Sequence, residues 1–140
     1  MVDSGVVQNR DLARDYLWRS EVRLRALAVL YDAESWADVV RESQEIVELA
    51  LKGLLRSCGV SPPRVHDVSD VLLAERERLP PGAVAYLDRM VSVSRRLRRD
   101  RELAFYGAED LTPSGFYTKE DARAARTDAG DLVGVIAPLV

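Results

Sequence analysis

Several residue types and patterns are scarce in this chain of 140 residues. Cys58 is the one cysteine, so no disulfide can form within the chain. His66 is the one histidine, so we expect no metal site built from histidine and cysteine. No Walker-type glycine loop is present, and we expect no cofactor. Nucleotide-binding sites of the glycine-loop type are therefore not expected.

Long apolar runs are also missing. The longest uncharged stretch, Leu132 to Val140, is far shorter than the ~20 apolar residues of a membrane span. The first residues lack the basic and apolar regions of a secretory signal. We therefore predict a cytoplasmic protein with a reduced cysteine and no membrane association.

The composition is that of one folded domain. Hydrophobic residues make up 47% and charged residues 31% of the chain, which argues against disorder. The net charge of −3 disfavours general nucleic-acid binding but leaves room for a local basic patch. We expect residues 1–8 to form a flexible N-terminal arm and residues 9–140 to form one domain.

Apolar periodicity predicts an all-α fold, because no segment shows the two-residue alternation of a strand. Gly59 and the double proline after it should end one helix. Thr118 and Asp121 resemble a capping box that opens another. The four main helices are expected at about 9–32, 34–57, 82–99 and 118–137, with a short extra helix at 65–78. In the first, the recurring apolar residues are Leu12, Tyr16, Val22, Ala26 and Val29.

The third main helix carries two apolar stripes side by side. Together they cover about half of the helix circumference, more than the ~100° arc that one bundle core requires. Either this helix is deeply buried, or the second stripe contacts another subunit. We predict the second arrangement, a homodimer. The first stripe is Val84, Leu87, Val91 and Ser94, and the predicted interface stripe is Tyr86, Met90, Val93 and Leu97.

The end of the same helix is rich in arginine. A helical wheel puts Arg98 and Arg101 on the apolar side, where an unpaired guanidinium cannot be buried. Either the helix ends near Leu97, or the arginines point into a cleft that holds an anion. Complementing the helix dipole explains some of these charges but not the neighbouring aromatic residues. The segment contains Arg95, Arg96, Arg98, Arg99 and Arg101, with Phe105, Tyr106, Phe116 and Tyr117 nearby.

Three stretches, 45–55, 59–68 and 99–122, make the chain resemble the HEPN family over about residues 9–137. The first stretch is Glu45 to Leu55, and the second contains the turn before His66. The third contains the arginine-rich segment up to Gly107 and the start of the helix after Phe116. The resemblance implies an up-and-down four-helix bundle that forms a homodimer. It also implies a partner, a minimal nucleotidyltransferase, in a toxin–antitoxin-type pair. Many family members are metal-independent ribonucleases.

The catalytic signature of such ribonucleases is an arginine followed a few residues later by a histidine. Here Tyr106 stands five residues after Arg101, where that histidine is expected. A tyrosine with a reference pKa of ~10 is a poor proton shuttle near neutral pH, compared with ~6.5 for histidine. We therefore predict RNA or nucleotide binding without cleavage, and the alternative is a divergent ribonuclease using Arg101 and Tyr106. The predicted ligand contacts are Arg95, Arg98, Arg99, Arg101 and Tyr106.

Two other polar groups have competing interpretations. His66 beside Asp67 is either a base oriented by a carboxylate or a residue that ties a turn to a helix, and we favour the second. Glu45, Glu48 and Lys52 mark either a polar groove or a solvated face of alternating charges. We favour the solvated face.

Overall fold

The computed structural model describes the backbone of residues 4–64, 68–106 and 112–140, and the side chains of residues 9–64, 68–98 and 112–140. These ranges contain helices and no strand, so the all-α prediction is confirmed. None of the described helices has the length and apolar character of a membrane span. The long helices are α1 (Ser4–Asp32), α2 (Trp36–Ser57), α5 (Leu87–Tyr106) and α7 (Lys119–Ile136). The short helices are α3 (Ser69–Ala74), α4 (Pro81–Val84) and α6 (Pro113–Phe116), with 3₁₀ turns η1 (Arg76–Arg78) and η2 (Ala137–Leu139).

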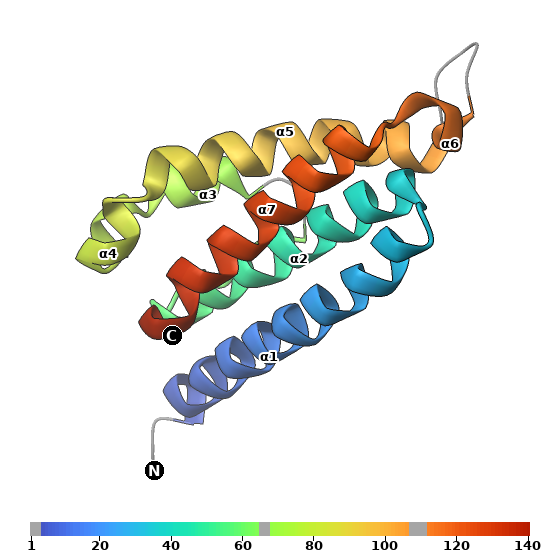
Figure 1. The fold of residues 1–140 in the computed structure, drawn as a ribbon. Coiled ribbons are helices and arrows are strands. Elements are labelled where there is room, and N and C mark those ends of the chain that lie inside the picture. Colours follow the sequence, from blue (N-terminus) through green and yellow to red (C-terminus); the bar gives the residue numbers. More distant parts are fainter. Residues whose placement is uncertain (1–3, 65–67, 107–111) are drawn as a thin grey trace.

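Helix α2 occupies the centre of the fold. It packs against α1, α5 and α7, and these four helices lie side by side (Figure 1). Gly53 lets α1 approach closely, because a Cβ there would lie 3.2 Å from the carbonyl oxygen of Ala13 and 3.3 Å from the Cβ of Tyr16. Most of the α2 surface is therefore packed inside the chain, with Ile46, Leu51 and other apolar side chains fully buried.

Local sequence signals set several helix ends as expected. Gly59 has a φ of 80°, the left-handed conformation that commonly follows a helix, and its N–H donates to the carbonyl of Arg56. At the start of α7, Thr118 Oγ1 accepts from the N–H of Asp121 at 3.2 Å. Asp121 Oδ2 accepts from the N–H of Thr118 at 2.9 Å. The predicted capping box is therefore confirmed.

Other boundaries differ from the sequence predictions. Helix α1 begins at Ser4, so it includes residues 4–8 of the segment expected as an arm. The predicted helix at 82–99 is divided by a turn at Ala85 and Tyr86 into α4 and α5, and α5 continues to Tyr106. The expected extra helix is the pair α3 and η1. The segment between the third and fourth predicted helices contains α6, which Thr112 caps through its hydroxyl.

The structure corrects the predicted dimer interface on the third main helix. Met90 is 0% exposed, and Val93 and Leu97 are 1% exposed, within this single chain. Tyr86, in the turn before α5, is half-buried against the same core. The reason is that α5 packs on α2 with one side while α3 packs against it as well. The wide apolar arc is therefore covered within the chain, and this stripe presents little surface to a second subunit.

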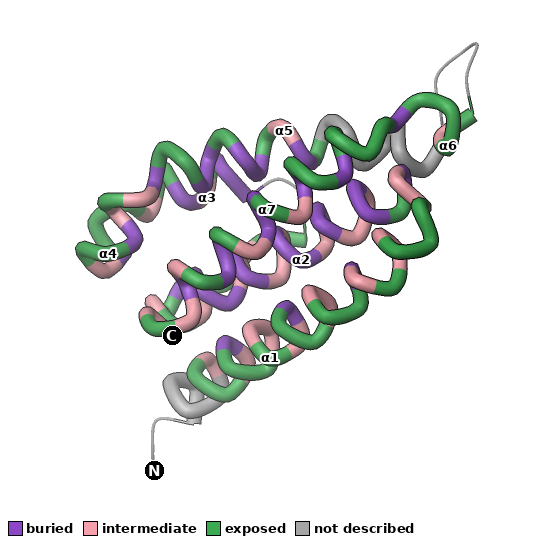
Figure 2. Tube along the Cα trace, in the orientation of Figure 1, coloured by how far each residue is buried: buried purple, intermediate pink, exposed green. Residues whose placement is uncertain are grey.

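The apolar face assigned to the first helix also needs correction. Val22 is 37% exposed and Val29 is 71% exposed, whereas Ala13 and Leu27 are fully buried. Trp18, at 61%, is exposed as well. Figure 2 shows the exposed outer side of α1 beside the buried α2. Helix α1 has two apolar rows, and the fold buries the one that contains Ala13 and Leu27.

Candidate functional site

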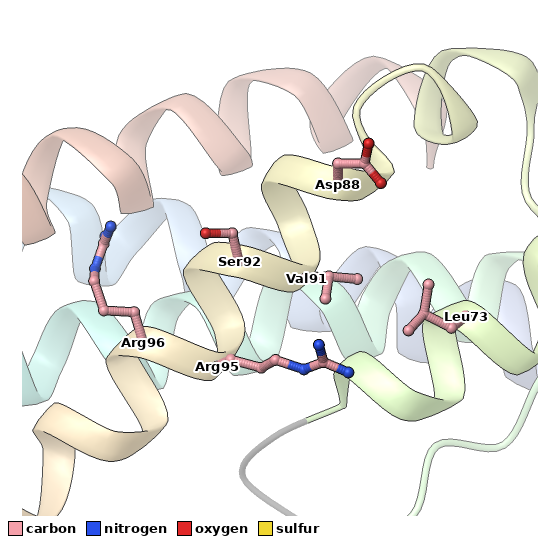
Figure 3. A pocket seen from close by; sticks show the side chains of 6 residues that line it. All are labelled: Leu73, Asp88, Val91, Ser92, Arg95 and Arg96. Carbon is pink, nitrogen blue, oxygen red and sulfur yellow. The ribbon is translucent and has the colours of Figure 1, made fainter.

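Two adjacent arginines of α5 point towards different neighbouring helices (Figure 3). Arg95 reaches towards α3, where its Nε donates to Ser69 Oγ at 3.1 Å and its Nη2 to Asp70 Oδ1 at 3.3 Å. Arg96 reaches towards α7, where its Nη2 donates to Asp128 Oδ2. The two side chains therefore belong to different polar clusters, although they are neighbours in the sequence.

The cluster on the α7 side is built around a buried carboxylate. Asp128 is only 8% exposed, and Arg89 Nη2 donates to its Oδ1 at 2.5 Å. This hydrogen bond raises the pKa of the Arg89 guanidinium above its ordinary value. One carboxylate thus holds Arg89 and Arg96, one oxygen for each, which ties α5 to α7. A structural role follows for Arg96, because its charge is already compensated.

The cluster on the α3 side borders a groove of about 710 Å³ along the outer face of α5. Leu73 of α3 and Val91 of α5 form its apolar part. Arg95 lies at one end and Asp88 at the other, two turns earlier on the same helix (Figure 3). The last two lining residues are Ser92 and Arg96. The groove therefore combines a cationic end, an apolar middle and an anionic end.

The other predicted ligand contacts are only partly described. Arg98 is exposed, so the expectation that it falls on a buried side of the helix is wrong. The row of Leu87, Val91 and Ser94 is buried, but Arg98, the next residue in this row, is exposed, which avoids the cost of burying its charge. Arg99, Arg101 and Tyr106 lie in the last two turns of α5, but their side chains are outside the described residues. His66 is outside the described residues too.

Asp70 and Asp128 are the acidic partners that the sequence interpretation missed. Asp100 and Glu102 lie nearer to the arginines in the sequence, but their side chains are outside the described residues. Asp128 carried a usable signal, because it lies three residues after buried Ala125 and four before buried Leu132. An acid at such an inward position predicts a cationic partner from a neighbouring helix. Asp70 carried no such signal.

The polar row on α2 is less exposed than predicted. Lys52 Nζ donates to Glu48 Oε2 at 2.9 Å, and both side chains are 14% exposed. Arg41 and Glu45 are half-buried in the same row. A fully solvated face is therefore wrong for this row. Among the described side chains, no group of His, Cys, Asp and Glu is arranged to hold a metal ion.

Comparison with known proteins supports one family. The model of the HEPN domain matches residues 13–137. The crystal structure of TT1696 from Thermus thermophilus is similar, with a TM-score of 0.74 and 25% sequence identity. The match covers 91% of this chain and 98% of that chain. No curated protein sequence matches. Because the family model spans most of the chain, the chain belongs to the HEPN domain family, whose members are nucleotide-binding, RNA-binding or ribonuclease-like modules.

Proposed function

We propose that this chain is a nucleotide- or RNA-binding HEPN module that holds ligand phosphates with Arg95 and the arginines after it on α5. The observation that carries the proposal is the exposed pair at the cationic end of the groove. The side chain of Arg95 is 53% exposed, and that of its partner Asp70 is 94% exposed. Arg95 is therefore reachable from solvent in a way that a buried structural arginine is not.

The pair between Arg95 and Asp70 is weak enough for a ligand to replace. An exposed ion pair contributes roughly 0.2–1 kcal/mol, because solvent screens it. A phosphate offers the guanidinium two parallel charge-assisted hydrogen bonds, which are stronger than neutral ones. Arg96 differs, because its partner Asp128 is 8% exposed and shared with Arg89. Arg95 is thus a better ligand anchor than Arg96 among the α5 arginines.

The two differently charged ends of the groove set the orientation in which such a ligand binds. Asp88 lies seven residues before Arg95, ~10.5 Å along the helix axis. Its carboxylate repels phosphate and can accept hydrogen bonds from the amino groups of a base. Leu73 and Val91 between the two ends supply apolar surface for a base. The volume of about 710 Å³ lies in the usual range for small-molecule sites, ~300–1,000 Å³.

The family supplies the wider setting of this proposal. We expect a homodimer that acts with a minimal nucleotidyltransferase, as one component of a toxin–antitoxin-type pair. HEPN domains often act as dimers, which supports the homodimer, and the nucleotidyltransferase follows from the family resemblance. The alternative is a divergent ribonuclease that uses Arg101 and Tyr106, and the helical backbone of α5 extends far enough to include both residues.

Titration with short RNAs and mononucleotides at low salt tests the binding. Arg95→Ala and Arg101→Ala should each weaken it roughly tenfold, the cost of losing hydrogen bonds to a charged group. The matched control is Arg123→Ala, because Arg123 is 62% exposed and pairs with the exposed Glu120. Arg41, on the α2 row, is half-buried and would be a poor control. Binding should also fall steeply with added salt.

Equal affinity of the Arg95 and Arg123 variants would remove the groove from the proposal. Incubation of the purified protein with total RNA separates binding from cleavage. Cleavage by the unmodified protein that disappears in Arg101→Ala would establish the ribonuclease alternative. RNA that stays intact while it binds would support the proposed module.

A further inference from the structure

Three neighbouring hollows follow one another across one face of the bundle. The first is the groove on α5, which Arg96 also lines, and Arg96 bonds Asp128 of α7. Asp128 lines a second hollow, of about 480 Å³, on the surface of α7. That hollow shares Arg123 and Thr127 with a third one, of about 450 Å³, between α7 and the end of α1. The three hollows therefore form a continuous surface path from α5 across α7 to α1.

The arrangement of the helices sets the length of this path. Helix α7 lies between α5 and α1 on this face and packs against both (Figure 1). The axes of packed helices are ~8–10 Å apart, so the path from α5 to α1 is ~20 Å long. A mononucleotide bound in the groove on α5 ends far short of α1. A ligand that fills the whole path is therefore a polymer.

The α1 end of the path holds an arginine without an acidic partner. Arg126 Cζ lies 5.1 Å from the ring centroid of Tyr31. Within the described part of the chain, no residue forms a hydrogen bond or an ion pair with Arg126. Asp131 is the acid among the residues that line this hollow, and it lies 3.7 Å from Arg89 of α5. The charge of Arg126 is therefore open to an anion from solvent.

Tyr31 holds the guanidinium of Arg126 in place for such an anion. Its ring packs edge-on against Trp36, with the ring centroids 5.1 Å apart, so the platform is itself fixed. A guanidinium that stacks on a ring keeps its N–H donors in its own plane, where they can bind a phosphate. Because Tyr31 already orients Arg126, little side-chain freedom is lost when the phosphate binds.

The middle of the path is electrically balanced. Glu120 accepts from Arg123 at 2.5 Å, which compensates that charge. Asp128 likewise pairs with Arg89 and Arg96. A phosphate chain that crosses α7 is thus neither strongly repelled nor strongly held there. The attraction is concentrated at the two ends of the path.

We propose that the path binds single-stranded RNA, with one phosphate at Arg95 in the groove and a later phosphate at Arg126 beside Tyr31. This inference rests on the proposed function and names its ligand class, an oligonucleotide. Two modest contacts on one strand reinforce each other, because the second forms within the complex that the first has made. An RNA of about eight nucleotides suffices, within the ~4–16 nucleotides of single-strand sites.

A length series tests the path. Fluorescence anisotropy at low salt compares cytidine monophosphate with labelled oligocytidylates of about four, eight and twelve nucleotides. Affinity should rise steeply once the RNA is long enough to reach α1. Arg126→Ala should weaken binding of the longest RNA roughly tenfold, the cost of losing hydrogen bonds to a charged group, and leave the mononucleotide unaffected. Arg95→Ala should weaken both.

The matched control removes the same charge away from the path. Arg14 is exposed and lies ~25 Å before Tyr31 along α1, and Arg14→Ala should bind all ligands like the unmodified chain. Tyr31→Leu should weaken the longest RNA about threefold, because Arg126 loses its platform. Tyr31→Phe keeps the ring and should have no effect.

Salt dependence gives a second readout that a merely structural arginine would not change. Loss of one phosphate contact should reduce the slope of log affinity against log salt by about 0.7 for a single strand. The unmodified chain and Arg126→Ala should therefore differ in slope with the longest RNA and agree with the mononucleotide.

The outcomes separate this path from the groove. If Arg126→Ala binds the longest RNA with unchanged affinity and slope while Arg95→Ala is weakened, the path is wrong and the groove stands. Equal losses for RNA and mononucleotide in Arg126→Ala would also overturn the path, because Arg126 would then act on the fold. If the unmodified chain binds neither ligand, the proposed function and the path are both wrong.

Discussion

Asp128 and Arg89 are joined at 2.5 Å between Oδ1 and Nη2, although they lie 39 residues apart in the chain. Asp128 comes from the middle of α7 and Arg89 from the start of α5. The second oxygen of Asp128 accepts from Arg96, two turns further along α5. A single carboxylate thus fixes the distance and rotation between two long helices that share few other contacts.

Replacing this carboxylate should destabilise the fold. Asp128→Ala is expected to lower the free energy of unfolding by about 1–3 kcal/mol, because it removes hydrogen bonds to two guanidinium groups. Urea unfolding followed by circular dichroism measures the change. Asp131→Ala is the control, since Asp131 is 54% exposed and lies 3.7 Å from Arg89. That variant should stay within about 0.5 kcal/mol of the unmodified chain. Equal losses in both would contradict the role of Asp128.

Removing the acidic partner of Arg95 should improve ligand binding. In the free protein Asp70 competes with phosphate for the guanidinium, so Asp70→Ala should raise the affinity for mononucleotides by about two- to fivefold. Isothermal titration calorimetry at low salt measures this gain. Glu120→Ala, which removes the partner of Arg123, should leave the affinity unchanged. A loss of affinity in Asp70→Ala would show that Asp70 itself contacts the ligand.

Two glycine substitutions should have opposite effects on stability. Gly53→Ala places a methyl group 3.2 Å from the carbonyl oxygen of Ala13 and should destabilise the fold by about 1–3 kcal/mol. Gly130→Ala on α7 meets no atom within 4 Å. It should stabilise the fold by up to about 1 kcal/mol, the difference in helix propensity. Thermal unfolding of the two variants checks both signs, and a neutral Gly53→Ala would mean that α1 can move away from α2 at little cost.

The lone cysteine should react slowly in the folded protein. Burial raises the pKa of the Cys58 thiol above its ordinary value of 9.0. At pH 8 the folded chain therefore holds less thiolate than the unfolded chain, and iodoacetamide should modify it more slowly until denaturant is added. The same shift affects stability. The thiol contribution is complete below pH 9.0 and is lost as the pH rises towards the folded pKa. Equal rates of modification in folded and unfolded protein would contradict this.

Local sequence signals predicted the structural features that depend on a few neighbouring residues, such as helix ends. Thr118 and Asp121 indicate the start of α7, because the side chain of each accepts a hydrogen bond from the backbone N–H of the other. Gly59 indicates the end of α2, because glycine adopts the left-handed conformation without a Cβ clash. Family resemblance in the segment around Glu45 and in the arginine-rich stretch indicated the HEPN domain, which the family model confirms. The ligand contacts on α5 remain predictions.

Local sequence signals did not predict the contacts between segments that are distant in the chain. The two apolar stripes of the third main helix were predicted to include an interface, but both are largely buried within the chain, where α2 and α3 pack against α5. Arg96 gave no sign that it bonds Asp128, because the two meet only when α5 lies beside α7. On α1, either apolar row fits a helix, and packing on α2 buried the one with Leu27 and left Trp18 outside. Periodicity shows how much of a helix surface is apolar. It does not show which segment covers that surface, because distant parts of the chain compete for the same contact during folding.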